Sequence, residues 1–216
     1  MNSSQKLLAY VQLLDAKLPT ASFTHAHHVE QRVQEGIISN VAQLEQHLVD
    51  HLQPHLFQWE APAIHSVYMA SSEQDAWTLA LIDKMIIQQI IPAESRDEAR
   101  KTGKRLLKLA HSLYPWMSFT VLERAVYEYQ AILSLTTLHA WINYHLGTER
   151  DQAVNCYLYT LLSCCISRAA RPLQLSIPQA GILTDRLSLQ MEQQWQEQSN
   201  QRQNSPGASP VSSIIK

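Results

Sequence analysis

Histidines are the residues of this sequence whose spacing most resembles that of metal ligands. They form a cluster and a series with a spacing of four: His25, His27 and His28, and His47, His51 and His55. Two imidazoles four residues apart on a helix can hold a divalent ion, but a catalytic site also needs a third ligand and an open position, and the sequence has no HExxH motif. We therefore predict no bound metal. The cluster is a candidate for a transient nickel or zinc contact, against the favoured interpretation of surface histidines, and the series is interpreted as a solvated helix face.

The cysteines and the absence of nucleotide-binding motifs argue against catalysis. Cys156, Cys164 and Cys165 are an odd number in apolar surroundings, and an adjacent pair is badly placed for a disulfide with itself, which favours a reducing compartment. Without a CxxC motif they are interpreted as small core residues. The sequence also lacks GxSxG, GxxxxGK[ST] and GxGxxG motifs. We therefore expect no enzyme activity, no cofactor and no GTP bound by this chain itself.

Charge and hydropathy disfavour two classes of partner. The chain has 17 Lys and Arg against 19 Asp and Glu, a formal net charge of -2, which gives no general electrostatic reason to bind nucleic acid or an anionic membrane. No apolar run reaches the roughly 18 to 20 residues of a membrane helix, and the N-terminal residues lack the apolar segment and cleavage site of a signal peptide. We expect a soluble cytoplasmic protein.

The basic residues of one predicted helix lie on a single stripe. Four of them recur every four residues: Arg96, Arg100, Lys104 and Lys108. Such a stripe can dock an acidic partner or remain in water. We favour the solvated face, because the neighbouring Glu94, Asp97 and Glu98 neutralise part of its charge.

Helical periodicity runs through most of the chain, which contains only 5 Gly and 9 Pro. We predict an all-α fold, a single compact bundle of about 8–10 helices. Long segments are expected over residues 24–35, 73–91, 94–113, 115–146, 149–171 and 179–196, with a helix capped by Ser39 or Asn40 that ends or bends near Pro54. The segment 149–171 is nearly all apolar and should lie at the centre. Trp77 is expected on the buried face of segment 73–91.

The final residues differ in composition from the rest of the chain. Residues 199–216 are rich in Ser, Asn, Gln and Pro and have little apolar material to offset the entropy of ordering. We find no internal repeat, and the linkers before residue 198 are too short to mark a domain boundary. The predicted organisation is one helical domain over residues 1–197 and a flexible C-terminal tail over residues 198–216.

Three blocks of the sequence carry short motifs in a recognisable order. The first fits the pattern D-x-x-L-P-T-G-x-F-S-H-S-x-G-L-E through Asp15, Pro19, Thr20, Phe23, His25 and Glu30. The second pairs an E-S-R segment at Glu94, Ser95 and Arg96 with a G-R-R-L-L-like helix that begins at Gly103. The third has Tyr157, Leu158 and Tyr159 ahead of Arg171, as in a Y-L-Y helix followed by an R-x-x-x-L-[GS] turn. In order and spacing the blocks resemble the UreF family, although Thr136 stands where the family has a proline.

This resemblance implies a non-catalytic role in a larger assembly. It implies an all-α homodimer that binds the accessory protein UreD (also called UreH) and the GTPase UreG, in a complex that inserts nickel into apo-urease. It also implies that the turn at Arg171 and the tail bind UreD, the tail through Val211, Ile214 and Ile215. Tyr159 is the candidate for the surface that faces UreG or a second copy, unless it is a buried tyrosine with one hydrogen bond.

Two other functions remain open at this point. A nickel-binding metallochaperone would use the histidine-rich segments and would lose its metal when His25, His27 and His28 are replaced by Ala. A small α-helical hydrolase has only its histidines in support, without a nucleophile and base pair. The scaffold hypothesis predicts instead stable complexes, regulation of UreG during urease maturation, and no turnover by the chain alone.

Overall fold

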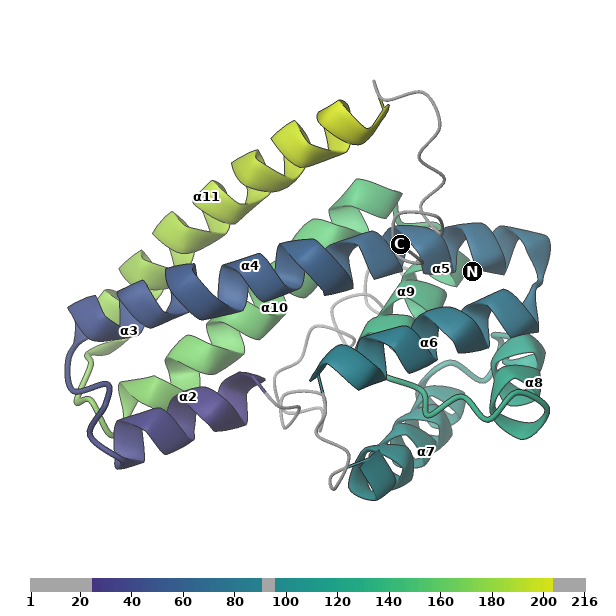
Figure 1. The fold of residues 1–216 in the computed structure, drawn as a ribbon, viewed down its shortest axis with the longest axis horizontal. Helices are drawn as coiled ribbons and strands as arrows, with labels where there is room; N and C mark the ends of the chain where they lie inside the picture. Colours follow the sequence, from purple (N-terminus) through teal and green to yellow (C-terminus); the bar gives the residue numbers. More distant parts are fainter. Residues whose placement is uncertain (1–24, 91–95, 204–216) are drawn as a thin grey trace.

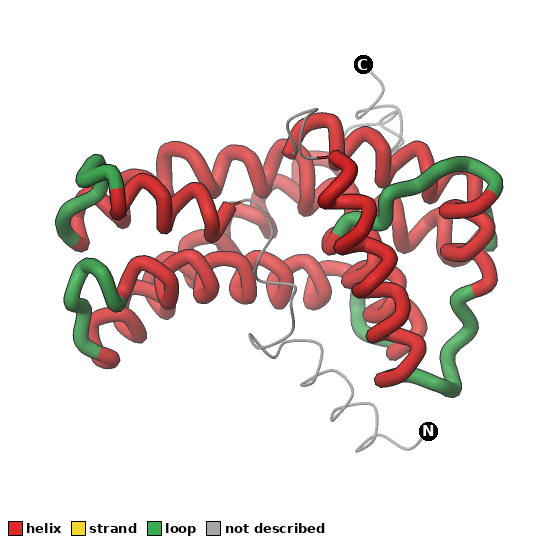
Figure 2. Tube along the Cα trace, turned by 90° about the horizontal axis from the view of Figure 1, so that it is seen from below, coloured by secondary structure: helices red, strands yellow, loops and turns green. Residues whose placement is uncertain are grey.

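The protein consists of helices joined by short loops in the part that the computed structural model describes, residues 25–90 and 96–203 (Figures 1 and 2). No strand occurs within these ranges, which confirms the all-α prediction. The described residues form eight continuous helical segments: α2 (His25–Gln34), α3 to α5 (residues 41–73), α6 (Ala76–Ile90), α7 (Arg96–Leu113), α8 (Thr120–Tyr127), α9 (Leu135–Leu146), α10 (Arg150–Ala170) and α11 (Ile177–Gln203).

Several helix ends lie where local sequence signals predict them. The side chain of Asn40 accepts a hydrogen bond from the backbone N–H of Gln43 at 3.0 Å and so caps α3. Gly147 ends α9 with a φ of 75°, a left-handed conformation that glycine adopts without the strain a Cβ would bring. The carboxylate of Glu149 then accepts the N–H of Gln152 at the start of α10. Each of these helix ends could therefore be predicted from the type of one residue.

The helix that carries Pro54 does not end there. It runs from α3 (Val41–His47) through α4 (Gln53–His55) to α5 (Ala61–Glu73), with two π-helical turns at Leu48–Leu52 and Leu56–Glu60. In an α-helix the ring of Pro54 would meet the carbonyl of Asp50, which here lies inside the first wide turn. The wider turn makes room for the proline, so the predicted end or bend is replaced by a continuous helix.

The buried face of α6 is not the one predicted. Leu79, Ile82 and Ile86 point into the core, and so does Asp83, whereas Trp77 is 56% exposed. The prediction for Trp77 was wrong because it considered only apolar residues, whereas the face that is buried includes the carboxylate of Asp83.

Asp83 also explains why the segment 115–146 is not one helix. Its carboxylate accepts the backbone N–H groups of Ile132, Leu133 and Ser134 at 2.8, 2.8 and 2.6 Å, and the hydroxyl of Thr137 at 2.8 Å. The three backbone donors belong to the loop between α8 and α9, where Leu133 has a φ of 70°, and Thr137 lies in the first turn of α9. The carboxylate thus replaces the helical acceptors of these N–H groups, and the predicted long helix is two helices.

The centre of the bundle is formed by α9 and α10, as predicted for segment 149–171. The long α5 packs on both, α2 and α11 pack on α10, and α6 packs on α8 (Figure 1). Trp141 of α9 and Leu162 of α10 are among the fully buried side chains. The last helix is longer than expected, since α11 continues to Gln203 with Trp195 and Ser199 buried. The predicted start of the tail at residue 198 therefore lies inside α11.

Candidate functional site

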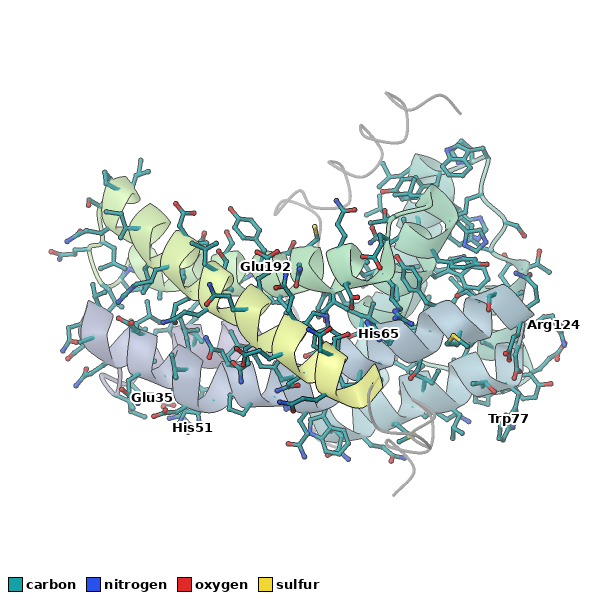
Figure 3. The ribbon with its side chains drawn as sticks, turned by 90° about the horizontal axis from the view of Figure 1, so that it is seen from above. Glu35, His51, His65, Trp77, Arg124 and Glu192 are labelled. Carbon is teal, nitrogen blue, oxygen red and sulfur yellow. The ribbon has the colours of Figure 1, made fainter. Side chains whose placement is uncertain are left out.

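The two tyrosines of the Y-L-Y motif lie on opposite sides of α10. Tyr157 is 3% exposed and points into the core, while Tyr159, two positions on and about 200° around the helix, is 47% exposed. Tyr159 lines a groove of about 200 Å³ between α10 and α11, together with Ser188 and Glu192 of α11 (Figure 3). The alternative of a buried tyrosine is therefore wrong for Tyr159 and describes Tyr157 instead.

A buried polar cluster surrounds Tyr157. The Tyr157 hydroxyl donates a hydrogen bond to the carboxylate of Glu60, and the Thr136 hydroxyl donates to the same carboxylate oxygen at 2.9 Å. His139 packs its ring edge-on against Tyr157 at a centroid distance of 5.0 Å, and its Nε2 lies 3.1 Å from the carbonyl oxygen of Ala153. Burial lowers the pKa of His139 to about 4, so its ring is neutral near pH 7.

Thr136 stands where the pattern of the resemblance has a proline. A proline has no hydroxyl, so it could not donate this hydrogen bond to Glu60. Burial and the neighbouring Glu60 carboxylate raise the pKa of Tyr157 well above its ordinary value, which keeps the phenol protonated and able to donate. The cluster joins the π-helical turn Leu56–Glu60, α9 and α10 in the core.

The first and third sequence blocks meet in space. Glu30 of α2 accepts a hydrogen bond from Arg168 of α10 at 2.9 Å, and Val29 beside it is 2% exposed. The hydrogen bond to Glu30 raises the pKa of Arg168 further. Arg171 follows at the exposed end of α10, in a turn where Gln174 has a φ of 55°. The signature residue Glu30 thus positions the helix end that carries Arg171.

A junction of three helices holds α11 in place. The Asp151 carboxylate oxygen Oδ1 lies 2.8 Å from Nε2 of His65 in α5, and it accepts the indole N–H of Trp195 in α11 at 3.0 Å. The rings of His65 and Trp195 meet edge to face at 5.0 Å. A histidine next to a carboxylate resembles part of a catalytic triad, but here the third partner is an indole, which cannot act as a nucleophile. The junction is structural.

Four histidines line a cavity between α2 and the helix that carries His47 and His51, which we call the histidine cavity. Its volume is about 500 Å³, and its polar lining consists of His28, Gln31, Arg32, Glu35, His47, His51, His55 and Gln89. The rings of His47 and His51 are 4.8 Å apart. Among the side chains that the structure describes, no group of three or more His, Cys, Asp or Glu residues is arranged to hold a metal ion. The histidine series, predicted to be a solvated helix face, lines this cavity together with α2; His51 is exposed, and His47 and His55 are half-buried.

The structure describes only some of the residues named from the sequence. His25 begins α2, but its side chain and that of His27 lie outside the described part, and His28 is exposed. Seven further residues lie outside it altogether: Asp15, Pro19, Thr20, Phe23, Val211, Ile214 and Ile215. Of the basic stripe, Lys104 and Lys108 are described and exposed, in agreement with the solvated interpretation.

Two central residues were missed from the sequence, although a signal for them exists. Glu60 and Asp83 are single carboxylates inside otherwise apolar stretches, and both are at most 1% exposed. A lone acid in such a stretch predicts either a kinked surface helix or a satisfied buried carboxylate. Only the positions of Thr136, Tyr157 and the α8–α9 loop decide between the two.

The fold and these side chains define a class of protein: an all-α helical protein with the carboxylates of Glu60 and Asp83 buried in its core and with Tyr159 on an exposed helix surface. A model of the UreF family matches residues 38–183, and the chain belongs to that family. It is also similar to the urease accessory protein UreF of Bacillus sp. (strain TB-90), with 26% identity over 166 residues, 77% of this chain and 73% of the relative. No helix within residues 25–90 and 96–203 is long and apolar enough to cross a membrane.

Proposed function

We propose that this chain acts in the maturation of urease, as a non-catalytic scaffold on which UreD and the GTPase UreG assemble with apo-urease for nickel insertion. Its membership of the UreF family and its similarity to a urease accessory protein support the proposal. We further propose that it works in the cytoplasm as a homodimer and that it regulates UreG.

The exposed position of Tyr159 is the observation that carries the proposal. A tyrosine that is 47% exposed beside a groove supplies a large, rigid contact area with one polar end, which is typical of residues that anchor protein interfaces. Leu189 of α11 is 59% exposed on the same helix that forms the other wall of the groove. We assign this α10–α11 surface to UreG or to a second copy of the chain, and the turn at Arg171 to UreD.

The rigidity of the bundle supports a scaffold role. α10 carries Tyr159 on its outer side and is held from within by Tyr157, from one end by Glu30 and from the other by Asp151. An interface built on a helix whose position is fixed at both ends loses little conformational freedom when a partner binds.

The test is co-purification of the tagged full chain with UreD and UreG from the same organism, followed by size-exclusion chromatography with light scattering. Urease activity of cells that lack the gene, complemented with each variant, is the functional readout. Tyr159→Ala should weaken assembly and lower urease activity. Tyr127→Ala is the matched control, because Tyr127 is 77% exposed on α8, outside this surface.

The outcomes separate the possibilities. Co-elution of the three proteins, with urease activity lost on deletion of the gene, would support the scaffold. Active urease without the gene and no complex would refute it. If the complex formed and the Tyr159→Ala variant assembled as well as the wild type, the assignment of the α10–α11 surface would be wrong and the scaffold proposal would stand.

No observation on the described residues favours the alternative of a nickel carrier. Calorimetry with Ni²⁺, on the wild type and on a variant in which His25, His27 and His28 are all replaced by Ala, would test it.

A further inference from the structure

The groove beside Tyr159, which we call the α10–α11 groove, lies next to exposed apolar side chains of α11. Ile182 and Leu189 are 67% and 59% exposed, and because they are seven positions apart they lie on the same side of this helix. The groove has a volume of about 200 Å³, and Cys156 and Leu158 of α10 also line it. A cavity of roughly 150 Å³ can hold benzene, so the groove has room for one aliphatic side chain. Exposed apolar surface beside such a hollow is typical of a surface that another segment covers.

Two polar groups of the α10–α11 groove lack a full set of partners among the described residues. The carboxylate of Glu192, which lies where α11 runs beside α10 (Figure 3), accepts a hydrogen bond from Asn155 at 3.4 Å and makes no ion pair with a described side chain. The Oδ1 atom of Asn155 is buried and accepts no hydrogen bond from the same part of the chain. The groove therefore fits a segment that supplies one positive charge and at least one hydrogen-bond donor.

The sequence after α11 favours a reversal of the chain direction. α11 ends at Gln203, and after two residues come Pro206 and Gly207. Pro-Gly suits the two central positions of a type II turn, because proline fixes the first φ and glycine adopts the positive φ of the second. We therefore expect residues 208–216 to run back along α11.

The reach of this segment matches the position of the groove. An extended chain advances about 3.3 Å per residue, so Ile214 and Ile215 lie about 20 and 23 Å beyond Ala208. α11 rises about 1.5 Å per residue, and the same length counted back from Gln203 ends about 13–15 residues earlier, at positions 188–190. Those positions include the α11 wall of the groove. One of the two isoleucines can therefore enter it.

We propose that residues 208–216 dock back into the α10–α11 groove of the same chain, with one of their two isoleucines beside Tyr159. Lys216, the one charged side chain in residues 204–216, then lies within reach of the Glu192 carboxylate. Because the segment is tethered to the helix on which it docks, its effective concentration is on the order of millimolar, and few contacts are enough. The docked segment covers Tyr159, so this surface is closed until another protein takes the tail.

This closure sets an order of assembly, a consequence that rests on the proposed function. UreD is the proposed partner of the tail, and UreG or a second copy of the chain is the proposed partner of the α10–α11 surface. Binding of the tail by UreD removes it from the groove and uncovers Tyr159 for the second partner. The chain therefore binds UreD first.

Disulfide trapping in the full chain tests the docking itself, without any partner. Cys156 lines the groove and forms no disulfide. Ile214→Cys and Ile215→Cys place a thiol at the groove, whereas Ser209→Cys, the matched control, leaves it roughly 17–20 Å back toward the turn. Under mild oxidation the faster isoleucine variant should link to Cys156 at least about tenfold faster than the control. Tandem mass spectrometry of tryptic peptides identifies and quantifies the linked cysteines.

A charge reversal tests the contact with Lys216. Glu192→Lys should slow trapping about two- to fivefold in the faster isoleucine variant, and Lys216→Glu in the same chain should restore the rate. Glu197→Lys is the control, because Glu197 is exposed on α11 about 140° around the helix from Glu192. It should leave the rate unchanged. Circular dichroism confirms that each variant is folded.

The outcomes separate the docking from the proposed function. Equal trapping rates at the three tail positions, rates that rise with protein concentration, or an unchanged rate in Glu192→Lys would each overturn the docking. Excess UreD should slow trapping in the isoleucine variants. Specific trapping that bound UreD leaves unchanged would overturn the order of assembly. Specific trapping without any complex of the chain and UreD would support the docking and contradict the proposed function.

Discussion

Replacing Asp83 by Asn tests the account of the α8–α9 loop. The carboxylate is 0% exposed and accepts four hydrogen bonds, two at each oxygen: from Ile132 and Leu133 at one, and from Ser134 and Thr137 at the other. An asparagine of the same shape has a single acceptor oxygen. If the NH₂ group faces Ser134 and Thr137, the Thr137 hydroxyl can turn to accept from it, and only the backbone N–H of Ser134 loses its acceptor. In the other orientation the N–H groups of Ile132 and Leu133 both lose theirs.

The structure gives a magnitude for this change. A buried donor left without an acceptor costs about 1–3 kcal/mol, so the orientation that loses one donor predicts a loss of unfolding free energy centred on about 2 kcal/mol. For a chain of this length that corresponds to a fall in Tm of roughly 4–8 °C. Urea denaturation of the full chain, followed by far-UV circular dichroism, measures both the midpoint and the slope.

A matched variant isolates the effect of burial. Asp75 also accepts backbone N–H groups, from Trp77 and Thr78 at 3.0 and 3.1 Å, but at the start of α6, where Asn is an equally good cap. Asp75→Asn should therefore cost only a few tenths of a kcal/mol. A loss of less than about 1 kcal/mol in Asp83→Asn, or equal losses in the two variants, would refute the view that one carboxylate holds the loop.

Three further predictions follow from the same structure. A Cβ on Gly103 would lie 2.1 Å from the carbonyl oxygen of Ile132, so Gly103→Ala should cost several kcal/mol in urea denaturation, whereas Gly181→Ala, with nothing within 4 Å, should stabilise α11 by up to about 1 kcal/mol. Because the pKa of His139 is about 4 in the folded protein and 6.5 in the unfolded chain, the unfolded state binds more protons between these values and stability falls as the pH drops through this window. His139→Gln should remove about 2 kcal/mol of the loss between pH 6.5 and 5, and an unchanged pH profile would contradict this. Deleting residues 204–216, which leaves α11 complete, should abolish UreD binding in a pull-down while Tm stays within about 2 °C of the wild type; retained binding would exclude the tail from the contact.

Much of the helical pattern could be predicted because its signals are local. Asn40, Gly147 and Glu149 act within one turn of their own position, and the apolar character of α10 is visible without any knowledge of its neighbours. For the Y-L-Y motif, the sequence left open whether Tyr159 is on the surface or buried, and the structure shows that Tyr159 is exposed and Tyr157 is buried.

The failures concern contacts between residues far apart in the chain. The break between α8 and α9 depends on Asp83, which is about 50 positions from the loop that it holds, and the phase of α6 depends on the same carboxylate. The histidine cavity depends on α2 lying beside His47 and His51, so a face read as solvated is partly enclosed. Spacing along one helix cannot reveal such partners, because it says nothing of what the facing helix contributes.

The two π turns around Pro54 have a consequence for how the length of this chain can vary. Each wide turn holds one residue more than an α-helical turn, as in the bonds from Gln53 to Leu48 and from Ala61 to Leu56. Loss of one residue at either turn would restore ordinary α-helix and leave the following helix at the same rotation. The buried side of α5 would still meet α9, so homologous chains can differ by one residue at each turn without a gap in a loop.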